Sequence, residues 1–169
     1  KNPGVITVLG GEERVDSVSN ALSYIEQLAE QTDKHFVLVH DAARPCLRAE
    51  DLALLKQSMK IAKSGLLLAN KVTDTIKVDD GNYSVSKTVS REALWRALTP
   101  QVFPLKLLTR ALTTVGNNRD KILITDEASA VEALGLSPLL IQGRSDNIKI
   151  TTHEDLILAS LILKTKNLK

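Results

Sequence analysis

The stretch Phe36-Val-Leu-Val-His-Asp-Ala-Ala-Arg-Pro45 decides the fold of this chain. Phe36–Val39 is a short apolar run with β-branched residues, which is typical of a strand in a sheet covered on both faces. Pro45 ends the element because proline has no N–H to donate to a neighbouring strand. Asp41 and Arg44 therefore lie just past the carboxyl end of a strand, where ligands bind in open α/β sheets.

Asp41 and Arg44 allow two interpretations. An acid at this place can hold a divalent metal through oxygen, and an arginine three residues later can bind a phosphate through two N–H groups. An Asp–Arg pair that only closes a turn explains the hexapeptide His40–Pro45 equally well. The hexapeptide alone does not decide between a site and a turn.

Length and composition favour a single domain of ordinary composition. A chain of 169 residues suits a single domain with a buried core. A net charge of +2 and 3% aromatic residues do not favour binding to nucleic acid, and no apolar run is long enough to span a membrane. The lone Cys46 is expected to be a small buried residue. The histidines are expected to be structural or exposed rather than metal ligands: His35, His40 and His153.

The first half of the chain predicts alternating strands and helices. Val5–Leu9 is expected to be a strand that opens the chain, which suggests that part of the sheet is missing upstream. Gly10-Gly11 is expected to turn into a helix with apolar spacing up to Leu28, although no phosphate-loop signature is present. An amphipathic helix over 49–63 and a strand over Leu66–Ala69 would complete a parallel βαβ unit with Phe36–Val39.

The segment after Ala69 has a different pattern. Thr75–Val78 and Tyr83–Val89 alternate polar and apolar residues around Asp79-Asp-Gly-Asn82, which favours a β-hairpin. An isolated hairpin is marginally stable in water. We therefore expect it to lean on a second chain as a dimerisation arm, or else to be a mobile surface flap.

The second half of the chain predicts further helices and strands. We expect a short helix over Arg91–Arg96, an extended segment over Thr99–Phe103, a helix starting at Pro104 and a loop over Asn117–Asp120. The next helix is expected to be capped by Thr125 or Asp126 and ended by Gly135. Strands over Leu139–Gln142 and Asn147–Ile150 should follow, and then a helix over Thr152–Lys164 with its leucines mostly inward. The N–H groups at the start of the helix near Thr125 could hold a phosphate oxygen.

Charged residues gather at the predicted loop ends. The set suits phosphate and Mg²⁺ and comprises Asp41, Arg44, Arg91, Asp146 and Lys149. No serine lies in a nucleophile-elbow motif. A phosphoryl-type transfer needs positioning and charge stabilisation, which this set can supply.

Five motifs occur in a fixed order along the chain: Gly10-Gly-Glu-Glu-Arg-Val-Asp-Ser17, Val39-His-Asp-Ala-Ala-Arg-Pro-Cys46, Leu94-Trp-Arg-Ala-Leu-Thr-Pro-Gln101, Ile124-Thr-Asp-Glu-Ala-Ser129 and Gly143-Arg-Ser-Asp-Asn-Ile-Lys149. Together they closely resemble the 2-C-methyl-D-erythritol 4-phosphate (MEP) cytidylyltransferases of the non-mevalonate isoprenoid pathway. The resemblance implies a Rossmann-like nucleotidyltransferase fold with a mostly parallel sheet. It also implies a protruding β-hairpin arm over about 73–91 that forms a homodimer.

The resemblance further implies the reaction and its residues. CTP and MEP would give 4-diphosphocytidyl-2-C-methyl-D-erythritol and pyrophosphate. Asp41 matches the Mg²⁺-binding aspartate, and Asp146 is a weaker candidate for a second metal-side acid. The residues that match substrate-binding positions are Gly11, Glu12 and Ser17 at the nucleotide, Ala42 near the ribose, and Arg44, Thr125 and Lys149 at the acceptor. Thr75 and Arg91 match arm residues that enter the neighbouring subunit's site, and with Lys149 they form the expected catalytic set.

One part of the family pattern is absent from these 169 residues. They contain neither a Pro-Ala-Ala-Gly-x-Gly-x-Arg loop nor a Pro-Lys-Gln sequence, which wrap the CTP phosphates in the family. We therefore expect residues 1–169 to be the C-terminal part of a single nucleotidyltransferase domain, inactive as a fragment alone. The alternatives are a pentitol (ribitol) phosphate cytidylyltransferase and a non-catalytic dimerising fragment. By analogy, the location is the bacterial cytoplasm or the plastid stroma.

Overall fold

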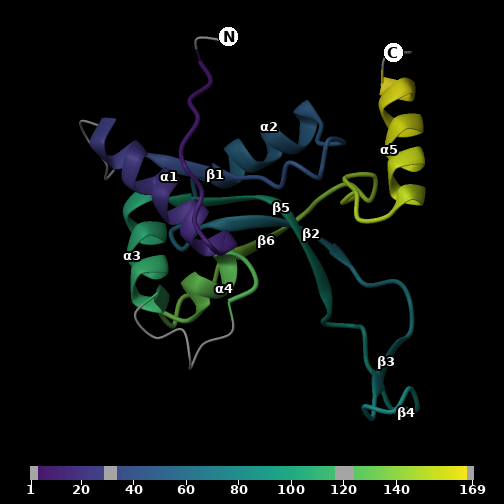
Figure 1. Ribbon diagram of the computed structural model, residues 1–169. Coiled ribbons are helices and arrows are strands. Elements are labelled where there is room, and N and C mark those ends of the chain that lie inside the picture. Colours follow the sequence, from purple (N-terminus) through teal and green to yellow (C-terminus); the bar gives the residue numbers. More distant parts are fainter. Residues whose placement is uncertain (1–3, 29–33, 117–123, 167–169) are drawn as a thin grey trace. The chain divides into compact units, whose positions relative to one another are not determined.

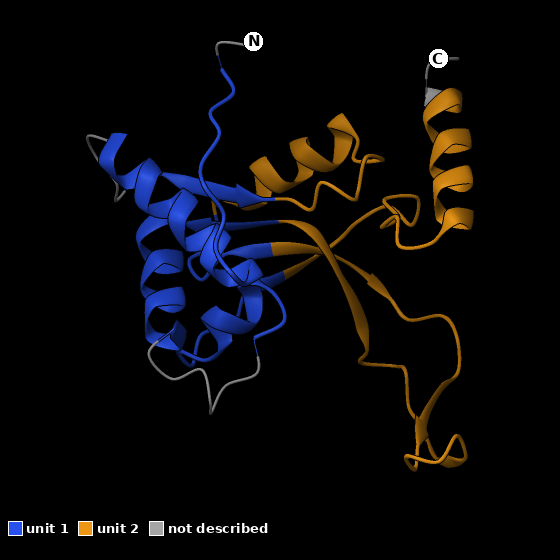
Figure 2. Ribbon diagram, viewed as in Figure 1, with its two compact units in different colours: residues 1–39, 61–66, 101–139 blue, residues 40–60, 67–100, 140–169 orange. Residues whose placement is uncertain are grey.

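The computed structural model describes residues 4–28, 34–116 and 124–166. Figure 1 shows their order along the chain: α1 (Arg14–Leu28), β1 (Phe36–Val39), α2 (Ala49–Ser58), β2 (Leu66–Lys71), β3 (Ile76–Asp79), β4 (Val85–Val89), β5 (Trp95–Pro104), α3 (Leu105–Gly116), α4 (Glu127–Glu132), β6 (Leu139–Gln142) and α5 (His153–Lys166). The chain divides into two compact units, coloured separately in Figure 2. Unit 1 holds residues 1–39, 61–66 and 101–139, and unit 2 holds 40–60, 67–100 and 140–169.

Four strands form a sheet in the order β1-β5-β2-β6. β1 and β5 run antiparallel, with Val37 opposite Phe103 and Val39 opposite Gln101. β5 lies between β1 and β2, so the two strands of the predicted βαβ unit are not hydrogen-bonded neighbours. The sheet is therefore mixed, which reflects the insertion of a later strand between two earlier ones.

Helix α3 is the centre of unit 1 and packs against α1 and α4. Its buried face repeats at helical spacing and comprises Leu105, Leu108, Ala111, Leu112 and Val115. Gly65, at a φ of +88°, lies against the ring of Phe103, where a Cβ atom would collide with the ring. Glycine is required there both for the left-handed backbone and for the close approach.

Unit 2 buries the continuous apolar run of β2 from Leu67 to Ala69. Leu55 of α2 is also buried, and the Sγ atom of Cys46 lies 3.8 Å from the carbonyl oxygen of Ala159 in α5. The prediction that Cys46 is buried is confirmed. No helix in the described ranges is both long and apolar enough to cross a membrane.

The predicted hairpin is confirmed as the antiparallel pair β3–β4 in unit 2 (Figure 1). Its turn places Gly81 at a φ of +91°, and the carboxylate of Asp80 accepts hydrogen bonds from the N–H groups of Asn82 and Ser84. These bonds lower the pKa of Asp80. The hairpin forms a two-stranded sheet of its own.

Three sequence predictions of secondary structure are wrong. Residues 5–9 form no strand, and Leu9 is 87% exposed, because an apolar β-branched run alone does not provide a pairing partner. Arg91–Leu94 is a turn closed by a backbone bond, and Trp95 already begins β5 rather than lying in a helix. Asn147–Ile150 has no regular structure; the N–H of Ile150 donates to the carbonyl oxygen of Ala43 instead.

Two helices differ from their predictions in extent or burial. α2 ends at Ser58, earlier than expected, and Leu52 is exposed. In α5, Ala159 is buried, but four apolar residues are exposed: Leu156, Ile157, Leu158 and Leu161. The prediction that Leu156 and Leu161 face inward is therefore wrong. Apolar residues occur around the whole helix, which explains why spacing could not identify its buried face. The predicted loop over Asn117–Asp120 lies outside the described residues.

Candidate functional site

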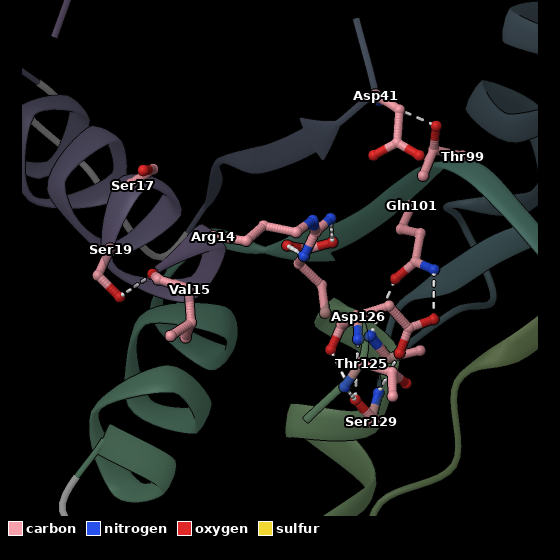
Figure 3. A network of polar contacts seen from close by, with 12 residues as sticks. Arg14, Val15, Ser17, Ser19, Asp41, Thr99, Gln101, Thr125, Asp126 and Ser129 are labelled. Atoms are coloured by element: carbon pink, nitrogen blue, oxygen red, sulfur yellow. Dashed lines mark hydrogen bonds and ion pairs between the residues drawn. The ribbon is translucent and has the colours of Figure 1, made fainter. Parts of the chain in front are cut away.

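Asp41 is held at the end of β1 by its backbone. Its N–H donates to Oγ1 of Thr99, 3.0 Å away in β5, and its carbonyl oxygen accepts from the N–H of Arg44 at 2.9 Å. Figure 3 shows the Asp41–Thr99 bond. The Nε atom of Arg44 lies 3.4 Å from the Asp41 carboxylate, so a turn-closing Asp–Arg pair is present. The turn leaves the Asp41 side chain at the end of the strand, as the sequence predicted.

A second cation reaches the same carboxylate from far along the chain. The Nζ atom of Lys149 lies 3.3 Å from Oδ2 of Asp41, the oxygen that also faces Arg44. Lys149 is 49% exposed. We call Asp41, Arg44 and Lys149 the Asp41 cluster; it lies entirely in unit 2. One carboxylate between two cations leaves positive charge available for an anion such as a phosphate.

Arg44 is fixed by burial and by a backbone acceptor. Its Nη1 donates to the carbonyl oxygen of Asn147 at 3.0 Å. Burial lowers the pKa of Arg44, although the neighbouring Asp41 carboxylate opposes this effect. An arginine nevertheless stays protonated throughout the physiological range. The lowered pKa therefore reflects the free-energy cost of burying a charged guanidinium, a cost that a bound anion would reduce.

His40 has a structural role, as predicted. Its Nε2 lies 3.0 Å from the carbonyl oxygen of Arg44, and its Nδ1 lies 3.0 Å from Oγ1 of Thr99. The carbonyl can only accept, so Nε2 carries the proton and Nδ1 accepts from the hydroxyl of Thr99. The ring therefore braces the Asp41–Arg44 turn against β5.

Asp146 is engaged by two arginines. Its carboxylate pairs with the guanidinium of Arg48 and lies 3.2 Å from Nε of Arg144. Burial alone would raise the pKa of Asp146, but the hydrogen bonds from Arg144 and Arg48 outweigh it and lower the pKa. The structure thus gives Asp146 a role in holding its loop, and a metal-side role remains a prediction. No group of three or more acidic, histidine or cysteine side chains among the described residues could hold a metal.

The remaining predicted residues fall in separate places. In unit 1 the N–H of Gly11 donates to Oγ of Ser17 at 3.0 Å, which brings these two residues together, and Glu12 beside them is exposed. In unit 2 Ala42 lies exposed in the Asp41–Arg44 turn. Thr75 is exposed at the start of the hairpin, and Arg91 at its end donates to the carbonyl oxygen of Thr73. Their action on a neighbouring subunit stays a prediction.

Thr125 precedes α4 in unit 1, within the network shown in Figure 3. The N–H groups of Thr125 and Asp126 both donate to Oγ of Ser129 at 3.1 Å, and Asp126 is the N-cap, as predicted. The N–H of Ala128 donates to Oε1 of Gln101. These N–H groups already have acceptors within the chain, and a phosphate contact at Thr125 stays a prediction.

Sequence reasoning missed the buried polar residues that support these groups. Thr99 and Gln101 flank Pro100 in β5, and Asn147 lies in the loop before Lys149; all three side chains are buried. A signal was present, because Thr-Pro-Gln interrupts an apolar run where a strand interior is expected. Buried polar residues need partners, which marks them as anchors.

The α/β fold with charged residues at the end of a strand places the chain among α/β proteins whose ligand sites lie at that edge of the sheet. A family model described as "IspD: 2-C-methyl-D-erythritol 4-phosphate cytidylyltransferase" matches residues 1–165, and the chain belongs to this family. A relative of that name from Acinetobacter baumannii (strain ACICU) is 49% identical over 158 residues, covering 94% of this chain and 65% of the relative. A second relative of that name, from Tolumonas auensis, is 46% identical, and the match covers 99% of this chain and 70% of the relative.

Solved structures agree with this assignment. The Francisella tularensis 2-C-methyl-D-erythritol 4-phosphate cytidylyltransferase is 38% identical, with a TM-score of 0.82 over 90% of this chain and 69% of that one. The predicted α/β nucleotidyltransferase fold is therefore confirmed. The chain spans less than two thirds of the length of two curated relatives that it matches, 65% of one and 61% of the other.

Proposed function

We propose that the protein containing this chain transfers the cytidylyl group of CTP to MEP, giving 4-diphosphocytidyl-2-C-methyl-D-erythritol and pyrophosphate. The observation that carries this proposal is the Asp41 cluster, where Lys149 and Arg44 flank one carboxylate oxygen. Two fixed cations suit the phosphate monoester of the acceptor, and the family membership supports the choice of acceptor. The bacterial relatives support a location in a bacterial cytoplasm.

The chemistry requires orientation and charge stabilisation. An oxygen of the acceptor phosphate attacks the α-phosphorus of CTP in line, a P–O bond forms, and the bond to the pyrophosphate leaving group breaks. Lys149 and Arg44 would hold the acceptor phosphate and reduce repulsion between the two anionic substrates. Gly11, Glu12 and Ser17 would meet the nucleotide, Ala42 the ribose and Thr125 the acceptor.

Asp41 fits a Mg²⁺ ion of the kind that binds substrate phosphates. Mg²⁺ is usually held by one or two carboxylates together with phosphate oxygens and water, so a lone carboxylate at the end of a strand suffices. The ion would neutralise charge on the CTP phosphates when bound. Lys149 lies close enough to Asp41 to balance the carboxylate when no ion is present.

The test is a transfer assay on two forms of the protein. The first is the 169 residues alone, which we expect to transfer no cytidylyl group because they supply mainly the acceptor side. The second joins them to the third of the Acinetobacter relative that the match does not cover; we call it the joined protein. We expect the joined protein to turn over CTP with MEP and to release pyrophosphate.

Ribitol 5-phosphate is the matched control acceptor. A folded joined protein that prefers ribitol phosphate would replace MEP as the substrate. A third outcome is a folded joined protein that transfers to neither acceptor, together with a 169-residue chain that does not bind MEP in calorimetry. That outcome would favour the interpretation as a non-catalytic dimerising module.

We further propose that the β3–β4 hairpin is a dimerisation arm that brings Thr75 and Arg91 to the partner's site. The hairpin has a sheet of its own and exposes Tyr83 and Val85, which supports burial against a second chain. Replacing residues 76–89 by a short Gly-Ser link should convert the dimer to a monomer in sedimentation. An unchanged dimer would leave the surface-flap interpretation.

Mixed dimers test whether the arm acts across the interface. Joined proteins with Arg91→Ala and with Lys149→Ala should each be nearly inactive. A 1:1 mixture that exchanges subunits should recover roughly a quarter of wild-type activity, because half the dimers are mixed and each has one complete site. No recovery after proven exchange would show that Arg91 acts within its own subunit.

A further inference from the structure

Asn147 is a buried polar side chain in a segment without regular structure. Only 1% of its surface is exposed, although it lies in the loop between β6 and α5. Burying an amide without hydrogen bonds costs free energy, so a buried asparagine in a loop needs a structural or functional reason. Its hydrogen bonds identify the reason.

The side chain ties the loop to β5. Nδ2 of Asn147 donates to the carbonyl oxygen of Thr99 at 2.8 Å. The Oγ1 atom of the same Thr99 accepts from the N–H of Asp41. Thr99 therefore fixes the loop through its backbone and the start of the turn through its side chain.

The backbone of Asn147 holds one of the two cations. Its carbonyl oxygen accepts from Nη1 of Arg44 at 3.0 Å. Three residues further on, the N–H of Ile150 donates to the carbonyl oxygen of Ala43 at 2.8 Å. The segment 147–150 is thus pinned to the turn at both ends, and Lys149 lies between the two fixed points.

One buried atom near these bonds, Oδ1 of Asn147, has no hydrogen-bond partner among the described residues. A leucine at position 147 would avoid the cost of the unsatisfied amide oxygen. The asparagine is therefore explained by its Nδ2 donor rather than by packing. The donor determines where the carbonyl oxygen of Asn147 lies, and through it the place of Arg44.

We propose that Asn147 is the positioning residue that sets Arg44 and Lys149 at the separation needed to bind a phosphate monoester. Asn147 acts through Thr99 and through its own backbone and does not touch the ligand. The identity of the monoester as the acceptor rests on the proposed function. The positioning itself rests only on contacts within unit 2.

The test titrates inorganic phosphate into the 169-residue chain and follows the Arg44 Nε–H and Lys149 Nζ signals by NMR. Asn147→Asp keeps the shape of the side chain but turns the donor into an acceptor that faces the Thr99 carbonyl. We expect phosphate affinity to fall about ten-fold and the Arg44 signal to move before phosphate is added. Asn147→Ala, which adds no charge, should weaken binding in the same direction.

Asn20→Asp is the matched control. Asn20 lies on α1 and its Nδ2 also donates to a backbone carbonyl oxygen, that of Leu9, at 3.2 Å. It belongs to unit 1 and is exposed, so phosphate affinity should not change. Unchanged phosphate affinity and an unmoved Arg44 signal in Asn147→Asp would overturn the proposal. Unfolding of both Asn147 variants, judged from the amide signals of unit 1, would also overturn the proposal. Asn147 would then be needed for folding rather than for positioning Arg44.

Kinetics of the joined protein separate this proposal from the proposed function. Asn147→Asp should raise the KM for MEP about ten-fold and leave the KM for CTP nearly unchanged, because only the acceptor-side cations move. If the joined protein transfers nothing but the variant still binds phosphate weakly, the proposed function fails and the positioning stands. A normal KM for MEP in the variant would refute the positioning alone.

Discussion

The polar network around Glu127 in unit 1 and the Asp41 cluster in unit 2 use the same kinds of side chain to different ends. Glu127 is 1% exposed and receives two bonds from the half-exposed Arg14, at 2.7 and 2.8 Å. Gln101 donates to Asp126, a bond drawn in Figure 3, and accepts from the N–H of Ala128. In this network the Glu127 carboxylate pairs with one cation, Arg14, and the buried amide of Gln101 uses both its oxygen and its nitrogen.

The Asp41 cluster is balanced differently. One carboxylate oxygen, Oδ2 of Asp41, faces two cations, one of which is half exposed. A fully satisfied buried network stabilises a single structure, whereas surplus positive charge can bind an anion. The difference predicts that substitutions in unit 1 affect stability and that substitutions in the cluster affect activity.

The largest effect is expected from Lys149→Ala. Removing this cation should lower kcat/KM for MEP in the joined protein about 100-fold, because electrostatic stabilisation of the reacting phosphate is lost. Unfolding by urea should change little, since the side chain is half exposed. Lys56→Ala, on the exposed surface of α2, is the control. A large loss of stability in Lys149→Ala would contradict the contrast between the two regions.

Gln101→Leu should break the unit 1 network. The variant leaves the N–H of Ala128 buried without its acceptor and removes a donor from Asp126, so stability should fall by about 2 kcal/mol in urea unfolding. Gln57→Leu on exposed α2 should change stability far less. Equal stability of the two variants would show that the network around Glu127 is not a stabilising one.

The smallest effect concerns a network that is satisfied but exposed, at the start of α5. The Asp155 carboxylate accepts from the N–H groups of Thr151 and Thr152 and from the Thr151 hydroxyl. These bonds lower the pKa of Asp155 to about 2. A depressed carboxyl pKa stabilises the helix start above the ordinary value of 3.8, and the stabilisation is lost as the pH falls toward 2.

NMR titration of Asp155 measures this directly. The midpoint should lie near pH 2, and the amide signals of Thr151 and Thr152 should follow the same curve. Asp155→Asn should remove that titration from both amides. A midpoint at the ordinary value of an aspartate would mean that the carboxylate is not held by the helix start.

The sequence predicted elements whose pattern is local. Phe36–Val39, Leu66–Ala69 and the Asp79–Asn82 turn were each specified by a short run of residues, and the structure confirms them. β5 was predicted only in part: the extended segment over Thr99–Phe103 is confirmed, but the start of the strand at Trp95 was missed because a helix was expected over Arg91–Arg96. Its residues from Leu98 to Phe103 are buried without alternation, so the period of a strand is hidden there.

The site was predicted in part for the same reason. Asp41 and Arg44 follow a recognisable strand, and their proximity to each other was expected. The resemblance placed Lys149 at the acceptor, but its contact with Asp41 depends on a loop that the sequence predicted as a strand. The alternating Ile148 and Ile150 indicated pairing, whereas the backbone of this segment bonds to Arg144 and Ala43. Contacts so distant in the chain are set by tertiary structure.

Thr99 and Gln101 lie two residues apart on β5, and each anchors a different network. Side chains in a strand alternate between faces, so an inserted or deleted residue between them would turn one anchor to the opposite face. During evolution this segment should therefore keep a constant length while its surface residues change freely. Length variation among relatives is expected instead at the 79–82 turn, where Gly81 has open space around its Cα.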